Sequence, residues 1–234
     1  MSLGEFFTFL SYLVGAAVFF WAAKAKRMAT NGIGMVVAIG FIAGIAGAKL
    51  TQMIAQGWPV SVPFLTIADP RVGGRALLGG VIFGWIGVEL AKRHLGIRRS
   101  TGDLFALALP AGEAVGRIGC FFNGCCYGTV CDLPWSVEQH GALRNPSQLY
   151  TAVVAAATFF FLLWYRKHHT MGEGGLFRLY LLIFASSRFL LEFVRQQDSL
   201  LFGLSMMQWF CLELILTIVV FTFLKRRKLS PAEG

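Results

Sequence analysis

Charged side chains lie inside apolar segments of this chain, at spacings that place them on shared helix faces. Glu113 and Arg117 are four residues apart, and Arg188, Glu192 and Arg195 recur at i, i+4 and i+7. Residues three or four apart are neighbours on a helix surface, so each set can form ion pairs that stabilise packing. Three arginines would share two carboxylates, and the surplus guanidinium favours an anion such as phosphate, which the planar fork binds through paired hydrogen bonds.

Cysteines form a second group of chemically active side chains. Four of them lie within twelve residues, close to Arg117: Cys120, Cys125, Cys126 and Cys131. A thiol beside an arginine can act as a nucleophile, and Cys125 is the candidate for this role. If the segment faces an oxidising compartment, we expect a disulfide between Cys126 and Cys131. The spacing lacks the C-x2-C pairs of common zinc sites, so we expect no metal; packing as small buried thiols is the other interpretation and best fits Cys211.

The composition indicates that a membrane holds these groups. Of 234 residues, 56% are hydrophobic and only 14% are charged. A soluble domain usually has about a quarter of its residues charged. Charged groups inside a bilayer usually face a cavity and find partners there. We therefore expect residues 1–234 to form a single integral membrane domain.

Apolar runs predict an all-α polytopic protein with about seven transmembrane helices. A spanning helix needs about 20 mostly apolar residues. The candidate spans are residues 6–23, 31–55, 76–92, 103–124, 147–165, 175–194 and 205–224.

Basic clusters predict the orientation of these helices. The net charge is +9, and its basic residues gather at every second loop, in residues 24–27, 92–99, 166–167 and 225–228. Cytoplasmic loops carry such an excess of Lys and Arg. This pattern places the N-terminus outside and the C-terminus in the cytoplasm, with outer loops at 57–74, 127–146 and 196–204. It also argues against a nucleic-acid partner.

Four ordered motifs resemble the bacterial prolipoprotein diacylglyceryl transferase family. They are GGRALLGG (73–80), GRIGCFFNGCCYG (116–128), RNPSQLY (144–150) and SRFLLEFVRQQD (187–198). The resemblance covers about residues 30–220. It implies a multi-pass enzyme of the bacterial inner membrane that moves the diacylglyceryl group of phosphatidylglycerol to the lipobox cysteine of a preprolipoprotein, without a metal or soluble cofactor.

The resemblance also implies site residues. Arg117 and Arg188 match the family's functional arginines, and they would stabilise the charge left on the phosphate. The expected substrate-binding residues come from the four motifs: Gly79, Gly80, Asn123, Gly124, Arg144, Ser147, Gln148, Tyr150, Glu192 and Arg195.

The chain departs from the family at proton-handling positions. Leu78 stands where the family has the histidine of His-Gly-Gly, Cys120 replaces an asparagine, and Cys125 replaces an acid. Asn145 and Thr151 replace a further histidine and acid. The anion-binding half of the site therefore resembles the family, and the proton-transfer half differs.

These departures leave several functions open. The chain could lipidate lipoproteins, or act as a divergent paralogue with another thiol or hydroxyl acceptor. Two alternatives are a non-catalytic protein that binds or transports anionic phospholipid, and a thiol redox membrane protein built on residues 120–131. His140 is the one histidine expected in an outer loop, so only it could replace the missing base.

Overall fold

The computed structural model describes residues 2–26, 32–55, 77–97, 100–196 and 201–229. Within these ranges the chain forms seven α-helices: α1 (Leu3–Ala25), α2 (Ile33–Ala55), α4 (Leu77–His94), α5 (Gly102–Phe122), α6 (Ser147–His168), α7 (Gly175–Leu191) and α8 (Met206–Leu229). A 3-10 turn, η1 (Glu192–Val194), follows α7, and two short strands, β1 (Val137–Gln139) and β2 (Ala142–Arg144), lie between α5 and α6.

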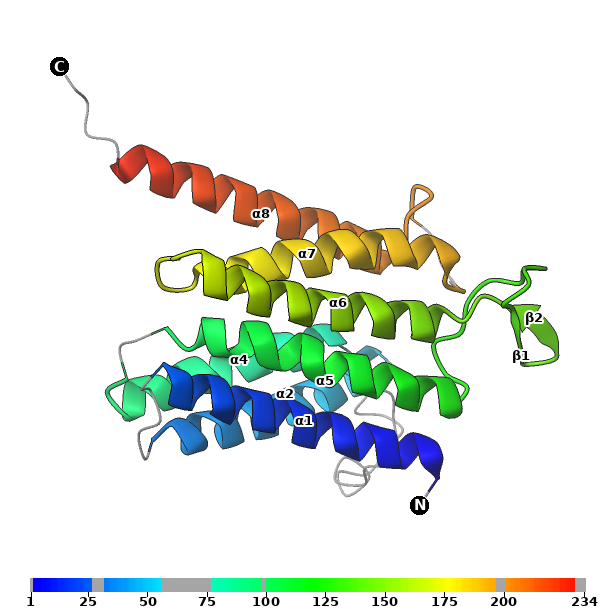
Figure 1. The fold of residues 1–234 in the computed structure, drawn as a ribbon, viewed down its shortest axis with the longest axis horizontal. Helices are drawn as coiled ribbons and strands as arrows, with labels where there is room; N and C mark the ends of the chain where they lie inside the picture. The colour runs from blue at the N-terminus through cyan, green and yellow to red at the C-terminus, as the bar shows by residue number, and fades with distance from the viewer. Residues whose placement is uncertain (1, 27–31, 56–76, 98–99, 197–200, 230–234) are drawn as a thin grey trace. The chain divides into compact units, whose positions relative to one another are not determined.

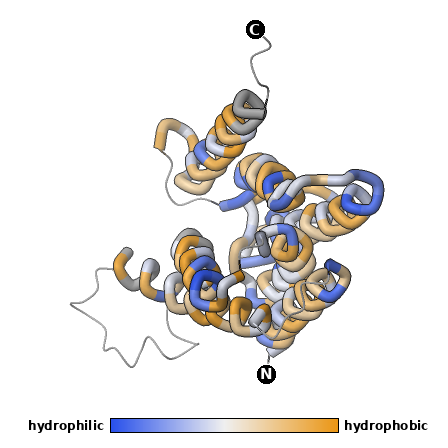
Figure 2. The backbone as a smooth tube through the Cα atoms, turned by 90° about the vertical axis from the view of Figure 1, so that its left-hand side faces the viewer, coloured by the Kyte–Doolittle hydropathy of each residue, from blue (hydrophilic) through white to orange (hydrophobic). Residues whose placement is uncertain are grey.

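Each expected span coincides with one of these helices. Among the described residues, five helices are long and apolar enough to cross a membrane, namely α1, α2, α5, α6 and α8. Hydrophobic residues predominate along the helices, and hydrophilic ones gather at their ends and in the connecting segments (Figure 2). Only 17% of the most apolar stretch of α8 is buried inside the protein. An apolar helix surface left this exposed fits contact with lipid rather than water.

The chain divides into two compact units, residues 24–99 and the remainder. In the larger unit α1, α5, α6, α7 and α8 run side by side (Figure 1). The rings of Phe19 in α1 and Phe105 in α5 lie 4.8 Å apart, and Leu107 and Leu162 are fully buried. Small residues allow α1 and α5 to approach: a Cβ on Gly112 would lie 3.1 Å from the Ser11 carbonyl oxygen.

A carboxylate from α5 caps the start of α7. The backbone amides of Gly174 and Phe177 donate to the two oxygens of Asp103, at 3.2 and 3.1 Å. These amides belong to the first turn of α7, whose donors have no partner within the helix. The cap fixes where α7 begins and therefore which of its residues face α5 and α6.

A β-hairpin, absent from the expected all-α fold, interrupts the segment between α5 and α6. β1 and β2 are antiparallel, with Gln139 opposite Ala142. His140 and Gly141 both have positive φ, 53° and 72°. Two such residues form the tight turn whose twist matches that of paired strands.

The smaller unit is built on the packing of α2 against α4. A Cβ on Gly44 would lie 3.2 Å from the Gly80 carbonyl oxygen, and one on Gly79 would lie 2.5 Å from that of Gly47. Close backbone approach of this kind needs glycine. Gly79 and Gly80 therefore lie at this helix contact, and the substrate-binding role expected for them stays a prediction. Gly73, Gly74 and the expected outer loop 57–74 lie outside the described residues.

Candidate active site

Arg117 and Glu113 form an ion pair on one face of α5. The Arg117 Nη2 and Nε atoms donate to one oxygen of Glu113, at 3.1 and 3.3 Å. Both side chains are mostly covered, with 17% and 21% of their surface exposed. The spacing of four residues predicted this pair, and the structure confirms it.

A second, more deeply buried ion pair lies at the end of α7. Arg188 Nη2 lies 2.7 Å from Glu192 Oε2, and the two side chains are 5% and 3% exposed. Arg195 Nη1 lies 3.9 Å from the same oxygen. The charges of Arg117 and Arg195 both act on Arg188, so the three guanidinium groups share one electrostatic neighbourhood. We call Arg117, Arg188 and Arg195 the arginine cluster.

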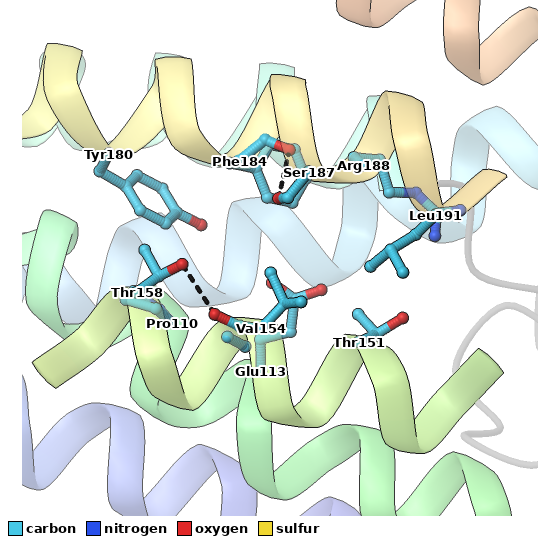
Figure 3. Close-up of a pocket in the computed structure, with 11 residues that line it drawn as sticks. Pro110, Glu113, Thr151, Val154, Thr158, Tyr180, Phe184, Ser187, Arg188 and Leu191 are labelled. Atoms are coloured by element: carbon cyan, nitrogen blue, oxygen red, sulfur yellow. Dashed lines mark hydrogen bonds between the residues drawn. The ribbon is translucent and has the colours of Figure 1, made fainter. Parts of the chain in front are cut away.

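A pocket lies between α5, α6 and α7, and Arg188 is the member of the arginine cluster that lines it (Figure 3). Both Glu113 and Arg188 line it. The buried Nε of Arg188 makes no hydrogen bond within the described part of the chain. A buried guanidinium nitrogen without a partner is costly, so its place beside a pocket suits it to receive a ligand oxygen.

Three thiols converge directly after α5. The Sγ atoms of Cys120, Cys125 and Cys126 all lie within 4.8 Å of one another, and we call them the thiol cluster. Cys120 lies in the last turn of α5, three residues after Arg117, and therefore near the same helix face. The charges of Arg117 and Arg195 both act on Cys126. The arginine and thiol clusters are therefore neighbours.

Contacts within the thiol cluster shift the pKa values of Cys125 and Cys126 in opposite directions. Hydrogen bonds with the thiols of Cys120 and Cys125 hold the pKa of Cys126 below its ordinary value, and the charges of Arg195 and Arg117 lower it further. Hydrogen bonds with Cys120 and Cys126 raise the pKa of Cys125. These directions favour Cys126 as the thiolate, whereas the sequence suggested Cys125 as the nucleophile.

The expected disulfide between Cys126 and Cys131 is wrong for this structure, where all five cysteines are unbridged. The Cys131 sulfur instead lies 3.1 Å from the Ser136 hydroxyl oxygen. Cys126 has a positive φ of 59°, which directs the chain back so that its thiol joins Cys120. Sequence spacing could not anticipate this reversal, because non-glycine residues rarely adopt it.

Residues at the start of α6 hold the thiol-bearing loop. Ser147 Oγ donates to the carbonyl of Cys126 at 2.8 Å, and Gln148 Nε2 donates to the carbonyl of Cys125 at 2.9 Å. Both side chains are buried. Their contacts here position the cysteines, and the substrate binding that the sequence predicts for Ser147 and Gln148 stays a prediction.

Arg144 and Tyr150 support the same region. Arg144 Nε donates to the carbonyl of Gln139 at 3.0 Å, and its guanidinium lies over the Tyr127 ring. The Tyr150 hydroxyl accepts a hydrogen bond from Trp135 Nε1 at 2.7 Å. These contacts secure the hairpin and the end of the loop.

Asn123, Gly124 and His140 complete the loop. Asn123 ends α5 and its side chain packs against Gly4 of α1. Gly124 has a φ of 64°, which favours glycine, and its carbonyl oxygen lies 2.7 Å from His140 Nε2. His140 therefore contacts the thiol-bearing loop, as an exposed residue.

The pocket contains polar residues that were not among the site residues expected from the sequence. Tyr180 and Ser187 of α7 and Thr158 of α6 line it together with Arg188. Figure 3 shows the Tyr180 side chain extending from α7 toward the pocket. The available signal was helical spacing, since residues 180, 184, 187, 188 and 191 share one face of α7.

Comparison with known proteins identifies the family to which this arrangement belongs. The family model for prolipoprotein diacylglyceryl transferase matches residues 6–224. The chain belongs to this family. Similar relatives include the phosphatidylglycerol–prolipoprotein diacylglyceryl transferases of Campylobacter curvus and Campylobacter hominis, which are 33% and 32% identical over 78% and 77% of this chain.

The match covers only part of these relatives. It spans 67% and 66% of the length of the two Campylobacter proteins. A transferase of the same name from Cupriavidus metallidurans is 30% identical over 88% of this chain and 83% of its own length.

Proposed function

We propose that the chain is a phosphatidylglycerol-dependent transferase that moves a diacylglyceryl group to the cysteine thiol of a prolipoprotein. Its family membership and the names of its relatives support this reaction. The observation that carries the proposal is the buried Arg188 at the edge of a pocket, whose Nε makes no hydrogen bond to any residue that the structure describes. A phosphate oxygen is a suitable acceptor for that nitrogen.

The arginine cluster then acts on the leaving group. Attack of the thiol sulfur on the glyceryl carbon breaks the bond from carbon to phosphate oxygen, and that oxygen gains negative charge. Arg188 and Arg117, already oriented by Glu192 and Glu113, stabilise this charge without reorganising. Arg195, which lies near Glu192, adds positive charge at the same place.

The remaining motif residues position this machinery. Ser147 and Gln148 hold the cysteine loop, and Arg144 and Tyr150 hold its continuation. Asn123 and Gly124 form the turn that carries the chain from α5 into that loop. Gly79 and Gly80 contribute indirectly, because they allow α4 to pack closely against α2.

The proposed setting is a bacterial inner membrane crossed by seven helices, with the N-terminus outside. Basic residues occupy the last turns of α1, α4 and α6, as expected for cytoplasmic helix ends. The thiol cluster follows the end of α5, which this topology places on the side of the membrane opposite the basic, cytoplasmic helix ends. The site therefore opens toward the outer leaflet. Phosphatidylglycerol supplies a phosphate at that depth.

Complementation tests the proposal. A bacterial strain depleted of its own lipoprotein transferase should regain growth when it expresses this chain, and Arg188→Ala should abolish the rescue. Arg178→Ala is the matched control, since Arg178 lies on the same helix and outside the pocket lining. Failure of a well-expressed, correctly inserted wild type to rescue would exclude the lipoprotein as acceptor and favour a paralogue with another acceptor.

A further inference from the structure

The proposed function requires a group that removes the proton of the acceptor thiol. Thiols react as thiolates, so some group must remove the proton before transfer. The family's histidine position holds Leu78, and leucine accepts no proton. The family's nearby asparagine and acid are replaced by Cys120 and Cys125, both of which belong to the thiol cluster. Cys120 and Cys125 lie at one point of the fold, together with Cys126.

The fold holds this thiol cluster in a defined arrangement. Cys120 is fixed by the last turn of α5, and the reversal at Gly124 and Cys126 returns the loop toward it. The buried Gln148 and Ser147 hold the carbonyls of Cys125 and Cys126. Groups that fix the ligands in this way are typical of protein metal sites.

Thiol number and spacing suit a thiophilic cation. Each Zn–S bond is about 2.3 Å, so three sulfurs around one zinc ion lie about 3.8 Å apart. The three Sγ atoms already lie within 4.8 Å of one another, and small side-chain rotations would close the difference. Three thiolates around Zn²⁺ carry one net negative charge, which the neighbouring Arg117 and Arg195 offset.

The three thiols leave one of the four zinc-ligand positions open. Among the described residues, no fourth cysteine, histidine or carboxylate belongs to the group. Cys131 contacts Ser136 instead. Zinc prefers four ligands, and three protein ligands with an open fourth position are the arrangement of catalytic rather than structural zinc sites.

We propose that Cys120, Cys125 and Cys126 bind a zinc ion whose open position takes the acceptor cysteine as a thiolate. This role rests on the proposed function, because it names how that function obtains its nucleophile. Spacing in the sequence gave no reason to expect a metal; the convergence of the three sulfur atoms does.

The step balances without another reactant. Coordination to zinc releases the proton of the acceptor thiol to solvent. The bound sulfur donates an electron pair to the glyceryl carbon of phosphatidylglycerol, and the carbon–oxygen bond breaks with its electrons passing to the phosphate oxygen. The products are a thioether and glycerol phosphate, whose added negative charge meets the arginine cluster. A neutral thioether binds zinc more weakly than a thiolate does, so the product can leave.

Zinc binding by the purified full-length chain tests the site. The reduced protein, carrying an affinity tag without histidine or cysteine, is equilibrated with Zn²⁺ and its metal content is measured by mass spectrometry. One zinc ion per chain is expected, with Zn–S distances of about 2.3 Å in X-ray absorption. Cys120→Ser and Cys126→Ser should weaken binding at least about tenfold, whereas Cys131→Ser should bind as the wild type does.

Co²⁺ binding by the wild type tests the same site without any variant, so the result does not depend on whether a variant folds. Co²⁺ bound to the wild type should show sulfur-to-metal charge-transfer bands from three thiolates, and a lipobox peptide should strengthen them. The same peptide with serine in place of cysteine should leave them unchanged. Absence of zinc from the reduced wild type, full binding by Cys126→Ser, a disulfide within the cluster, or no spectral response to the cysteine peptide would each overturn the proposal.

Failure of this proposal can be told apart from failure of the proposed function. A chain that transfers the diacylglyceryl group but binds no zinc disproves the metal site alone. A chain that binds zinc through the thiol cluster but transfers nothing to any lipobox peptide disproves the transferase.

Discussion

Arg188 and Glu192 form the most buried charged pair in the described part of the larger unit. Their side chains are 5% and 3% exposed, at a separation of 2.7 Å. Removing one partner of such a pair leaves an uncompensated buried charge, which costs about 3–5 kcal/mol. The arginine proposed to bind phosphate is therefore also needed for the fold.

Replacing Arg117 should separate the contribution of an arginine to transfer from its contribution to the stability of the fold. Because Arg117 is more exposed than Arg188, we expect Arg117→Ala to abolish transfer while lowering the free energy of unfolding by only about 1 kcal/mol. Arg188→Ala should abolish transfer and destabilise the protein by about 3–5 kcal/mol. Denaturant unfolding in detergent measures both. Equal destabilisation by the two variants would refute the difference in burial on which this prediction depends.

The thiol cluster predicts an inverted order of reactivity. Cys125 is exposed and Cys126 is half-buried, so accessibility alone favours alkylation of Cys125. The lowered pKa of Cys126 keeps it a thiolate below the ordinary thiol range, and the raised pKa of Cys125 keeps it protonated. In reduced, metal-free protein, iodoacetamide should therefore label Cys126 first. Peptide mass spectrometry reads the order, and faster labelling of Cys125 at neutral pH would contradict it.

Sequence predicted the ion pairs at this scale but not the thiol cluster. Glu113 with Arg117 and Arg188 with Glu192 are four apart in a helix, so their spacing alone brings them together. The thiols meet because Cys126 adopts a left-handed backbone and because Gln148 holds the loop. Neither condition has a local signature in the sequence.

Apolar runs that end in basic clusters explain why the helices could be predicted closely. The expected spans 147–165 and 175–194 correspond to α6 and to α7 with η1. The β-hairpin could not be predicted, because its strands have three residues each and its turn is His140-Gly141 rather than a common Asn-Gly. Hydrophobic periodicity needs longer segments than these.

Glycine packing between α2 and α4 gives a prediction at the scale of elements. A Cβ on Gly79 would lie 2.5 Å from the Gly47 carbonyl oxygen and would also meet the Thr51 hydroxyl. Backbone cannot yield easily, so Gly79→Ala should lower the free energy of unfolding by about 1–3 kcal/mol. Gly34→Ala is the control, because nothing lies within 4 Å of its added Cβ.

Thermal unfolding of the two variants in the same detergent measures this difference. Gly34→Ala should be neutral or slightly stabilising, since alanine favours a helix over glycine by up to about 1 kcal/mol. Wild-type stability in Gly79→Ala together with a loss of transfer would return Gly79 to the substrate-binding role expected from the sequence.

At the scale of the whole molecule, the charge distribution predicts topology. Seven helices match seven expected spans within the described residues, and five of them are long and apolar enough to cross a membrane. With the N-terminus outside, alkaline phosphatase joined after Pro134 should be active, because that loop is external. Joined after His169, it should be inactive. The reverse pattern would place the thiol cluster at the cytoplasmic surface and contradict the proposed site.

A single membrane domain over residues 1–234 stays a prediction, and so does the sharing of one reaction by the arginine and thiol clusters. Three observations support that reaction: family membership, the pocket beside Arg188, and the Arg188 Nε, which has no hydrogen-bond partner among the described residues. The central claim is that the arginine cluster stabilises a departing phosphate while a lipoprotein thiol takes the diacylglyceryl group.

Mass spectrometry of a lipobox peptide, incubated with the purified chain in phosphatidylglycerol-containing nanodiscs, tests that claim most directly. The wild type should convert the peptide to its diacylglyceryl thioether and release one glycerol phosphate for each peptide modified. Arg117→Ala and Arg188→Ala should each reduce the rate at least about a hundredfold, as expected for loss of one preorganised donor to a developing anion. An unmodified peptide with the well-folded wild type, or undiminished rates in both variants, would contradict the account.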